Sequence, residues 1–431
     1  MRRGLRMLGG CIAATILAGR ALAQGAPPFL PPTGDVSLRA ALAATLVANP
    51  DLAVFSAETR AREARALQAG LLPNPEISAE VEEFAGSGSR RAFRSAETTI
   101  RLSQLIELGG KRSKRRDAAL LERDIAGWDF ESRRATVLAE ATEAFISALS
   151  GQERLTVSAK LVDLAGESLR SVDASVRAGA SSPVERKRAQ VFLAEAAAQH
   201  RLFERELAVA YQALSASWGS SVVTFRSVLG DLERIEEPPP LEGLVQGIGA
   251  NPDLARWTTE IASREAELAL SRAGRVPDVR VGAGPRYYAE GDSAAAVVEL
   301  SVPLPLFDRR QGQIAEANER LSKARLERTA ADIFVRSALA RDHERLRAAF
   351  DHARALRDTI LPEARAAYEA ATEAYAQGAL RYVDVLDVQR TLFDLRDQYV
   401  ATLADYQRAL TALERLAGGA AGPTLDQETQ P

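Results

Sequence analysis

The sequence contains one pattern twice, and this duplication constrains the fold more than any other feature. Asn49-Pro50-Asp51-Leu52 opens the first copy, and Asn251-Pro252-Asp253-Leu254 opens the second. Each opening is followed by an alanine-rich helical stretch, two strand-like segments, a very long helical run, a glycine break and a further helix. Matching positions lie 202 residues apart at the asparagines and 199 apart at Gly179 and Gly378. So steady a spacing predicts two copies of one structural unit packed side by side.

The boundaries of the copies follow from composition. Pro238-Pro239-Pro240 separates them. We assign residues 24–235 to the first structural repeat and residues 236–418 to the second. Residues 419–431 show no periodicity, and we expect a disordered tail there.

Residues 1–23 have the parts of a secretory signal peptide. Arg2 and Arg3 precede an apolar run over residues 8–18, and Ala21-Leu22-Ala23 forms a small-residue cleavage site. A membrane anchor would need about 20 apolar residues. Cys11 has no apolar stretch before it, so the sequence does not predict an acylated cysteine. The only cysteine and both methionines are lost with the signal, which excludes disulfides and soft-metal cages from the mature chain.

Charge excludes nucleic acid as a partner. The chain carries 55 basic and 58 acidic residues. Both signs are interspersed along the predicted helices, which is typical of solvated helical faces and leaves no basic stripe.

Two pairs of segments alternate as β-strands do. Residues 76–82 and 97–103 form the first pair, and residues 279–283 and 297–302 form the second, with turns at Gly86-Ser87-Gly88-Ser89 and Glu290-Gly291-Asp292-Ser293. In an exported protein this alternation is typical of outer-membrane barrel strands. Four strands cannot close a barrel, so several chains would have to share one, and three chains would give twelve strands. Two half-buried hairpins in a soluble domain remain the alternative.

The long helical runs favour the membrane interpretation. Residues 111–178 contain no proline, and residues 310–377 contain only Pro362. Such a run spans about 100 Å, so these helices must leave the membrane. Apolar residues recur at the three- and four-residue spacing of coiled coils, at Leu138, Ala141, Ala144, Phe145, Ala148, Leu149, Val385, Leu386, Leu392, Leu395, Tyr399 and Leu403. A fibrous coiled coil would not explain the strand pairs.

The sequence shows no arrangement of catalytic residues, and we predict neither an enzyme nor a cofactor. His200, His343 and His352 fall on predicted helices, and the last two are nine residues apart, so they do not share a helix face as metal ligands would. We expect all three histidines to be ordinary surface residues.

From about residue 37 to residue 416 the sequence resembles the TolC-like outer-membrane efflux factors. The resemblance is carried by the two Asn-Pro-Asp-Leu openings, by Tyr375 three residues before Gly378, by Val383-Asp384-Val385-Leu386-Asp387, and by Pro303-Leu304-Pro305-Leu306-Phe307. Residues 105–112 and 306–312 look more like the CzcC-like, cobalt-zinc-cadmium branch than the drug-efflux or hemolysin-export branches.

This resemblance implies a mainly α fold with a membrane β-barrel portion. Three identical chains would form a twelve-stranded barrel in the outer membrane that continues into an α-helical tunnel across the periplasm. The expected partners are outer-membrane lipid, a periplasmic adaptor protein and an inner-membrane pump of the resistance-nodulation-division type. The chain would be a passive duct for divalent heavy-metal cations. The alternatives are a channel for drug efflux or type I secretion, or a periplasmic coiled-coil scaffold that spans no membrane.

The resemblance also implies a gate where the helices turn, at Gly179 and Gly378. Aspartates there, Asp384 and Asp387, would ring the opening, and Tyr375 would belong to the network that keeps the helices closed. The arginine expected soon after the glycine is displaced, since Leu380 stands at that place and Arg381 follows. The sequence therefore does not determine which residues form the salt bridges that close the gate. Glu185 holds the place in the first repeat that Asp384 holds in the second.

The spacing of these acids supports the same interpretation independently. Asp384 and Asp387 are three residues apart and share a helix face, so threefold symmetry would place six carboxylates around one axis. Acids at a helix N-terminus also offset the helix dipole, and the sequence leaves both roles open.

Overall fold

The computed structural model describes residues 29–418 of the chain. Contacts divide the chain after Leu30, and every element described below belongs to the unit that begins at Pro31. The predicted signal peptide, residues 1–23, and the predicted tail, residues 419–431, lie outside the described residues.

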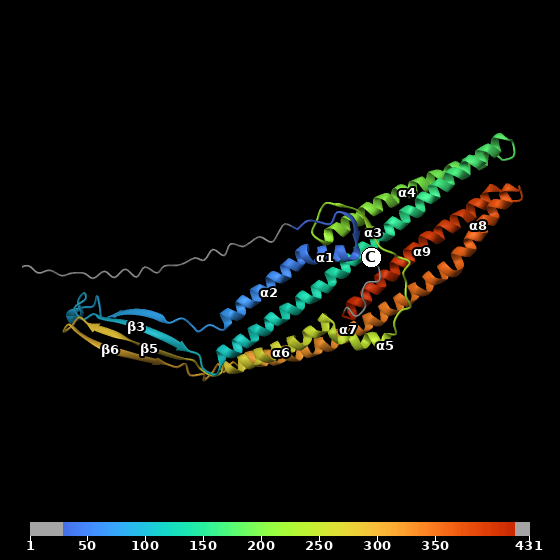
Figure 1. Ribbon diagram of the computed structural model, residues 1–431. Helices are drawn as coiled ribbons and strands as arrows, with labels where there is room; N and C mark the ends of the chain where they lie inside the picture. The colour runs from blue at the N-terminus through green and yellow to red at the C-terminus, as the bar shows by residue number, and fades with distance from the viewer. Residues whose placement is uncertain (1–28, 419–431) are drawn as a thin grey trace, which may run out of the picture. The chain divides into compact units, whose positions relative to one another are not determined.

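Each repeat contains, in the same order, a pair of helices, two strands and the long helices (Figure 1), and within the described residues two further short strands occur in the first repeat only. The first repeat comprises β1 (Gly34–Ser37), α1 (Leu38–Ala48), α2 (Pro50–Ala69), β2 (Glu76–Glu82), β3 (Glu97–Ile106), α3 (Lys111–Arg177), α4 (Pro183–Ser217) and β4 (Phe225–Leu229). The second comprises α5 (Leu241–Gly247), α6 (Pro252–Ala273), β5 (Val279–Tyr288), β6 (Ser293–Ser301), α7 (Gln311–Ala355), a π-helical turn (Leu356–Ile360), α8 (Leu361–Ala376) and α9 (Tyr382–Leu416).

The long helices differ between the repeats. Helix α3 runs unbroken for 67 residues, about 100 Å. Its counterpart is interrupted by the π-helical turn, which lies just before Pro362. Proline has no N–H to donate and its ring crowds the carbonyl four residues earlier, and a wider turn relieves this conflict. The single proline of the second run therefore divides α7 from α8.

The duplicated Asn-Pro motif joins two helices in each repeat. Asn49 caps α2 by accepting from the Asp51 amide at 2.9 Å, and its Nδ2 donates to the Ser217 carbonyl at 2.8 Å. Asn251 caps α6 in the same way, because its side-chain oxygen accepts from the Asp253 amide at 2.8 Å. The proline that follows each asparagine needs no hydrogen-bond acceptor at the first position of a helix. The motif therefore stacks the start of α2 on the end of α4.

The four long strands form one antiparallel sheet in the order β2-β3-β5-β6. The pairing of β3 with β5 joins the two repeats, and β2 and β6 form the edges. Strands β5 and β6 are longer than the sequence predicted, and their turn lies at the expected residues. The connection from β2 to β3 is a loop over residues 83–96 with a short 3₁₀ turn (Gly88–Arg90), longer than the predicted tight turn.

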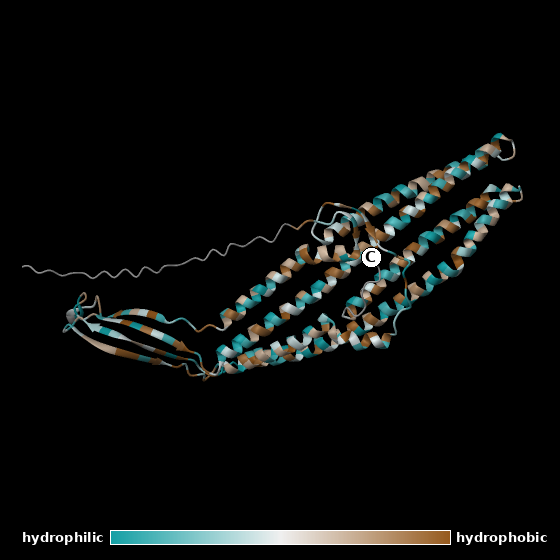
Figure 2. Cartoon of the chain, in the orientation of Figure 1, coloured by the Kyte–Doolittle hydropathy of each residue, from teal (hydrophilic) through white to brown (hydrophobic). Residues whose placement is uncertain are grey.

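The sheet exposes a large apolar surface. Ile77, Ile100, Leu102, Val298 and Leu300 are all more than half exposed. Figure 2 shows hydrophobic segments along the strands as well as along the helices. Monomeric soluble proteins rarely leave such a patch uncovered. Two half-buried hairpins in a soluble domain do not fit this exposure.

The helical core follows the predicted apolar spacing. Ala141, Phe145, Ala148 and Leu149 of α3 are buried, as are the predicted positions of α9 other than Leu395. Leu138, Ala144 and Leu395 are partly covered. Leu339 and Leu346 of α7 pack with residues of α9 in one cluster. Within residues 29–418 no single helix has the length and apolar composition to cross a membrane, although the bent pair α1 and α2 meets both criteria together.

The expectation that all three histidines are surface residues is wrong for His343. Its side chain is buried, and Nε2 lies 2.9 Å from the Pro239 carbonyl, which can only accept, so Nε2 carries the proton. Tyr406 likewise donates to the Glu236 carbonyl at 2.7 Å. His343 is buried because the linker between the repeats lies against α7. His352 is exposed, next to Gln398.

Candidate functional site

The predicted gate residues lie at two helical turns, one in each repeat. Helix α3 leads from β3 to the turn into α4, and α7 and α8 lead from β6 to the turn into α9. Both turns therefore lie at the opposite end of the helices from the sheet (Figure 1). We call the two turns together the tip, residues 178–182 and 377–381.

Glycine makes both turns possible. Gly179 and Gly378 have φ angles of +73° and +74°, in the left-handed region. The amide that follows each glycine donates back into the last helical turn, Ala180 to Ser175 at 3.0 Å and Ala379 to Ala374 at 2.8 Å. This is the Schellman arrangement that ends a helix.

Asp384 and Asp387 occupy different environments on the first turns of α9. Asp384 accepts from the Arg381 amide at 3.2 Å, and the Arg381 guanidinium lies 3.4 Å away. Asp387 is exposed, and its carboxylate has no partner among residues 29–418. The sequence left two roles open for these acids, a helix cap and a ring of charge. Asp384 caps the helix, and Asp387 presents a free negative charge.

Glu185 does not repeat the arrangement of Asp384. Its N-cap, Ser182, accepts from the Val184 amide at 3.2 Å, so the serine hydroxyl caps α4. The Glu185 carboxylate turns inward, and its Oε2 is buried without a hydrogen-bond partner in the described part of the chain. Glu185 therefore faces the helix packing rather than an exposed ring.

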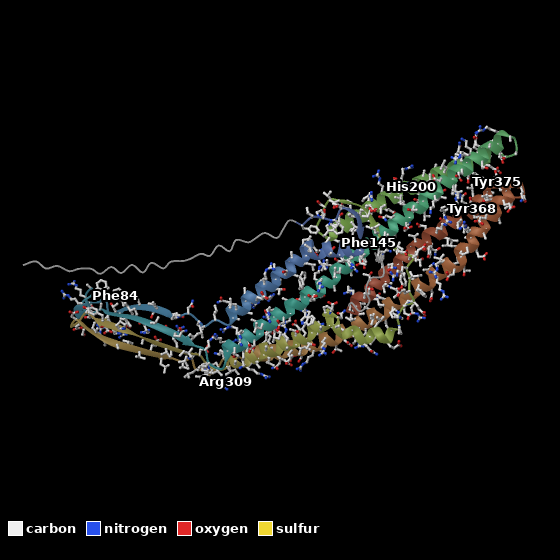
Figure 3. All side chains as sticks on the ribbon, in the orientation of Figure 1. Phe84, Phe145, His200, Arg309, Tyr368 and Tyr375 are labelled. Atoms are coloured by element: carbon white, nitrogen blue, oxygen red, sulfur yellow. The ribbon has the colours of Figure 1, made fainter. Side chains whose placement is uncertain are left out.

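Tyr375 packs at an angle against a second tyrosine, Tyr382, which the sequence did not predict. Its ring centre lies 5.7 Å from that of Tyr382, and Tyr382 is only 2% exposed. Burial raises the pKa of Tyr382 to about 12, and the nearby Ser168 hydroxyl opposes this shift without a well-formed hydrogen bond. Figure 3 shows Tyr368 and Tyr375 near the tip end of α8.

Buried polar atoms without partners gather near the tip. Among the described residues they include the hydroxyls of Tyr375 and Tyr382 and both amide atoms of Gln389, which is fully buried. Gln190, at the matching position of the first repeat, is exposed. An unpaired buried polar group costs about 1–3 kcal/mol. The helix packing near the tip is therefore less favourable than in the apolar core. Tyr368 and Tyr375 are seven residues apart on α8, and Tyr382 and Gln389 are seven apart on α9, so each pair shares a face of its own helix. The turn between the helices interrupts this spacing, so it could not have identified the contact of Tyr382 with Tyr375.

The described residues contain no group of three or more His, Cys, Asp or Glu side chains that could hold a metal ion.

An exposed apolar sheet lies at one end of helices about 100 Å long, and carboxylates lie on the first turns of α9 at the other end. Together they define the class of outer-membrane channels that extend into the periplasm. The comparisons with known proteins agree. The family model described as outer membrane efflux protein matches residues 41–220 and 244–419.

Individual relatives match almost the whole chain. The cobalt-zinc-cadmium resistance protein CzcC of Cupriavidus metallidurans is 32% identical over 89% of this chain and 90% of its own length. The pyoverdine export outer membrane protein OpmQ of Pseudomonas putida is 26% identical over 86% of this chain and 83% of its own length. The crystal structure of CusC superposes with a TM-score of 0.79 at 17% identity, over 93% of this chain and 96% of CusC.

The chain belongs to the outer membrane efflux protein family. The predicted resemblance to its CzcC-like branch, the fold class and the location in the outer membrane are confirmed.

Proposed function

We propose that the chain is the passive exit channel of a tripartite efflux system and acts as a homotrimer. The single observation that carries this proposal is the open sheet. Strands β2 and β6 each pair on one side only within residues 29–418, and every residue of β2 is exposed. A sheet edge cannot remain unpaired in lipid, so β2 of one chain would pair with β6 of the next, and three chains would close twelve strands.

The partners in this proposal are a periplasmic adaptor and an inner-membrane pump of the resistance-nodulation-division type. The tip is the part of the chain farthest from the membrane sheet, because α3 and the α7–α8 pair each lead from the sheet to a turn. An energy-coupled pump would therefore meet the channel through the tip. The duct itself would carry out no chemistry.

The cargo in this proposal is a divalent heavy-metal cation. Similarity to CzcC, whose name states cobalt-zinc-cadmium resistance, supports it, as does the free carboxylate of Asp387 at the tip. Similarity to OpmQ, whose name states pyoverdine export, favours a channel for organic molecules as the second candidate. A periplasmic scaffold that spans no membrane is not supported, because it would leave the apolar sheet exposed to water.

Growth of a deletion strain tests the cargo. The strain, and the same strain complemented, are compared across zinc, cobalt, cadmium, nickel and copper and across hydrophobic drugs. We expect sensitivity to metals alone, restored by complementation. Sensitivity to drugs alone would overturn the metal assignment. The mass of the purified detergent-solubilised protein tests the trimer separately, and a monomer would overturn the proposed channel.

A further inference from the structure

Arg275 and Arg309 lie where the sheet joins the helices of the second repeat, at positions where the first repeat has no basic residue. Position 109 of the first repeat is glycine, and the matching position of the second is Arg309. Leu71, just after α2, is likewise matched by Arg275, just after α6. The second repeat therefore has basic side chains at junction positions where the first has none, whereas the basic side chains of the first junction lie at the start of α3, over residues 111–116. Figure 3 shows Arg309 at this junction.

The basic side chains of the first junction are occupied within the chain. Lys111 lies 2.7 Å from Asp278, Arg112 donates to the Gly70 carbonyl at 2.6 Å, and Arg115 donates to Glu107 at 2.6 Å. Arg275 and Arg309 are exposed, and their guanidinium groups have no hydrogen-bond or ion-pair partner among residues 29–418. Their charges are free to bind an external group.

The backbone holds these two arginines beside one hollow. Arg310 begins α7 with a φ angle of +57°, where the matching Gly110 has +68°. The Arg310 side chain lies directly against Gly274. A Cβ atom added to that glycine would lie only 2.5 Å from Arg310 Cδ, so a larger residue at position 274 would clash with the arginine. This contact packs the end of α6 against the start of α7. A hollow of about 570 Å³ between them is lined by Arg275, Leu306, Phe307, Arg309, Gln311, Ile314, Ala315 and Asn318.

The apolar face of the sheet continues into this hollow. Val298, Leu300, Val302, Leu304 and Leu306 are alternate residues, each at least 42% exposed, and Phe307 is 91% exposed. Val298 and Leu300 share one face of β6, because alternate residues of a strand do. The exposed apolar residues continue past Ser301, the last strand residue, to a turn in which the Leu306 amide donates to the Leu304 carbonyl at 2.9 Å. Arg309 follows Leu306 within about 10 Å of chain. An arginine at that distance from the end of an apolar stripe reaches the headgroup layer.

We propose that this hollow binds an anionic phospholipid of the periplasmic leaflet. Arg275 and Arg309 would bind the phosphate, because the guanidinium fork matches phosphate oxygens, while Leu304, Leu306 and Phe307 would contact the acyl chains. The helices extend from this junction into the periplasm, so the lipid belongs to the leaflet that faces it. The proposal rests on the outer-membrane location and is independent of the cargo.

Native mass spectrometry of the full-length channel, with phosphatidylglycerol or phosphatidylcholine added to the detergent, tests the proposal. We expect phosphatidylglycerol to be retained and phosphatidylcholine to be lost. The double variant Arg275→Gln/Arg309→Gln should weaken retention of phosphatidylglycerol by roughly 10- to 30-fold, from the contribution of two arginines near a lipid surface. The control Arg328→Gln/Arg347→Gln removes the same charge from exposed positions of α7 and should retain the lipid.

Equal retention of phosphatidylglycerol by the two double variants would overturn the proposal, as would equal retention of both lipids by the unmodified channel. If the first double variant does not assemble, Arg309→Gly replaces it. That change gives position 309 the residue that the matching turn of the first repeat already accepts. The Arg309→Gly variant should assemble normally and retain several-fold less phosphatidylglycerol than the unmodified channel.

Discussion

The side-chain amide of Asn251 donates a hydrogen bond of 2.9 Å to the backbone carbonyl of Leu416. The contact places the N-terminus of α6 at the C-terminus of α9, so the positive end of one helix dipole faces the negative end of the other. Asn49 makes the same contact with Ser217 in the first repeat. Asn251 is 1% exposed, whereas Asn49 is partly exposed.

Replacing these asparagines should therefore destabilise the two repeats unequally. Asn251→Ala removes a helix cap and leaves a buried carbonyl unpaired, and we expect a loss of about 2–3 kcal/mol. Asn49→Ala should lose about 1 kcal/mol, because water can replace its partners. Thermal unfolding of the purified channel, followed by circular dichroism at the helix band, measures both losses. Equal losses would show that burial does not distinguish the two caps.

The glycines of the tip have room for a side chain, but their backbone conformation is one that other residues adopt only with strain. An added Cβ at Gly179 or Gly378 would meet nothing within 4 Å, yet both residues have positive φ angles. Each Gly→Ala change should cost about 1–2 kcal/mol from backbone strain alone. Gly127→Ala, in the interior of α3 with equally open space, is the matched control and should stabilise the protein by about 0.5–1 kcal/mol. The same unfolding measurement applies, and a stable Gly378→Ala variant would contradict the assigned turn.

Much of this fold could be predicted because its signals are local and occur twice. The Asn-Pro openings, the alternating strands and the proline-free run of α3 each describe contacts between near neighbours in sequence. The burial of His343 could not be predicted, because it depends on a linker 104 residues away along the chain. The contact between the Tyr382 and Tyr375 rings could not be predicted, because the chain reverses between them and helical periodicity carries no information across such a turn.

The two aspartates of the predicted gate should contribute unequally to block by multivalent cations. Asp387 is exposed and free, whereas Arg381 partly neutralises Asp384. Asp387→Asn should weaken block of single-channel conductance by hexamminecobalt(III) by roughly tenfold or more, from about 1 kcal/mol for each carboxylate lost in water. Asp384→Asn should have a smaller effect. Trimer assembly should be unchanged in both, and an equal effect of the two changes would show that the Arg381 pair opens in the assembled channel.

Glu414 of α9 gives the folded protein a dependence on pH near neutrality. Its Oε1 is buried without a hydrogen-bond partner in the described part of the chain. It lines a cavity of about 510 Å³ with Trp128 and Leu138. The cavity also contains Arg134, which pairs with Glu131 at 2.8 Å, and Arg415. Burial raises the pKa of Glu414 to about 7.

The sign of this dependence follows from proton binding. Below pH 4 the carboxyl is protonated in both the folded and the unfolded chain, so its burial carries no ionisation cost. Between about pH 4.5 and pH 7 the unfolded chain releases its proton while the folded chain keeps it, so stability falls as pH rises. Above pH 7 the carboxyl is ionised in both states, so the loss of stability does not increase further. One pKa unit corresponds to 1.36 kcal/mol, and the partial exposure of the side chain reduces the total to about 1–2 kcal/mol.

Glu414→Gln should therefore remove this slope and make the protein more stable than the unmodified chain at pH 8. The unfolding temperature measured from pH 5 to pH 8 gives both curves. Glu319→Gln, an exposed position of α7, is the control and should follow the unmodified protein. If Glu414→Gln instead destabilises the protein at pH 8, the ionised carboxylate has a cationic partner in the assembled channel, and the neighbouring chain becomes the place to look for it.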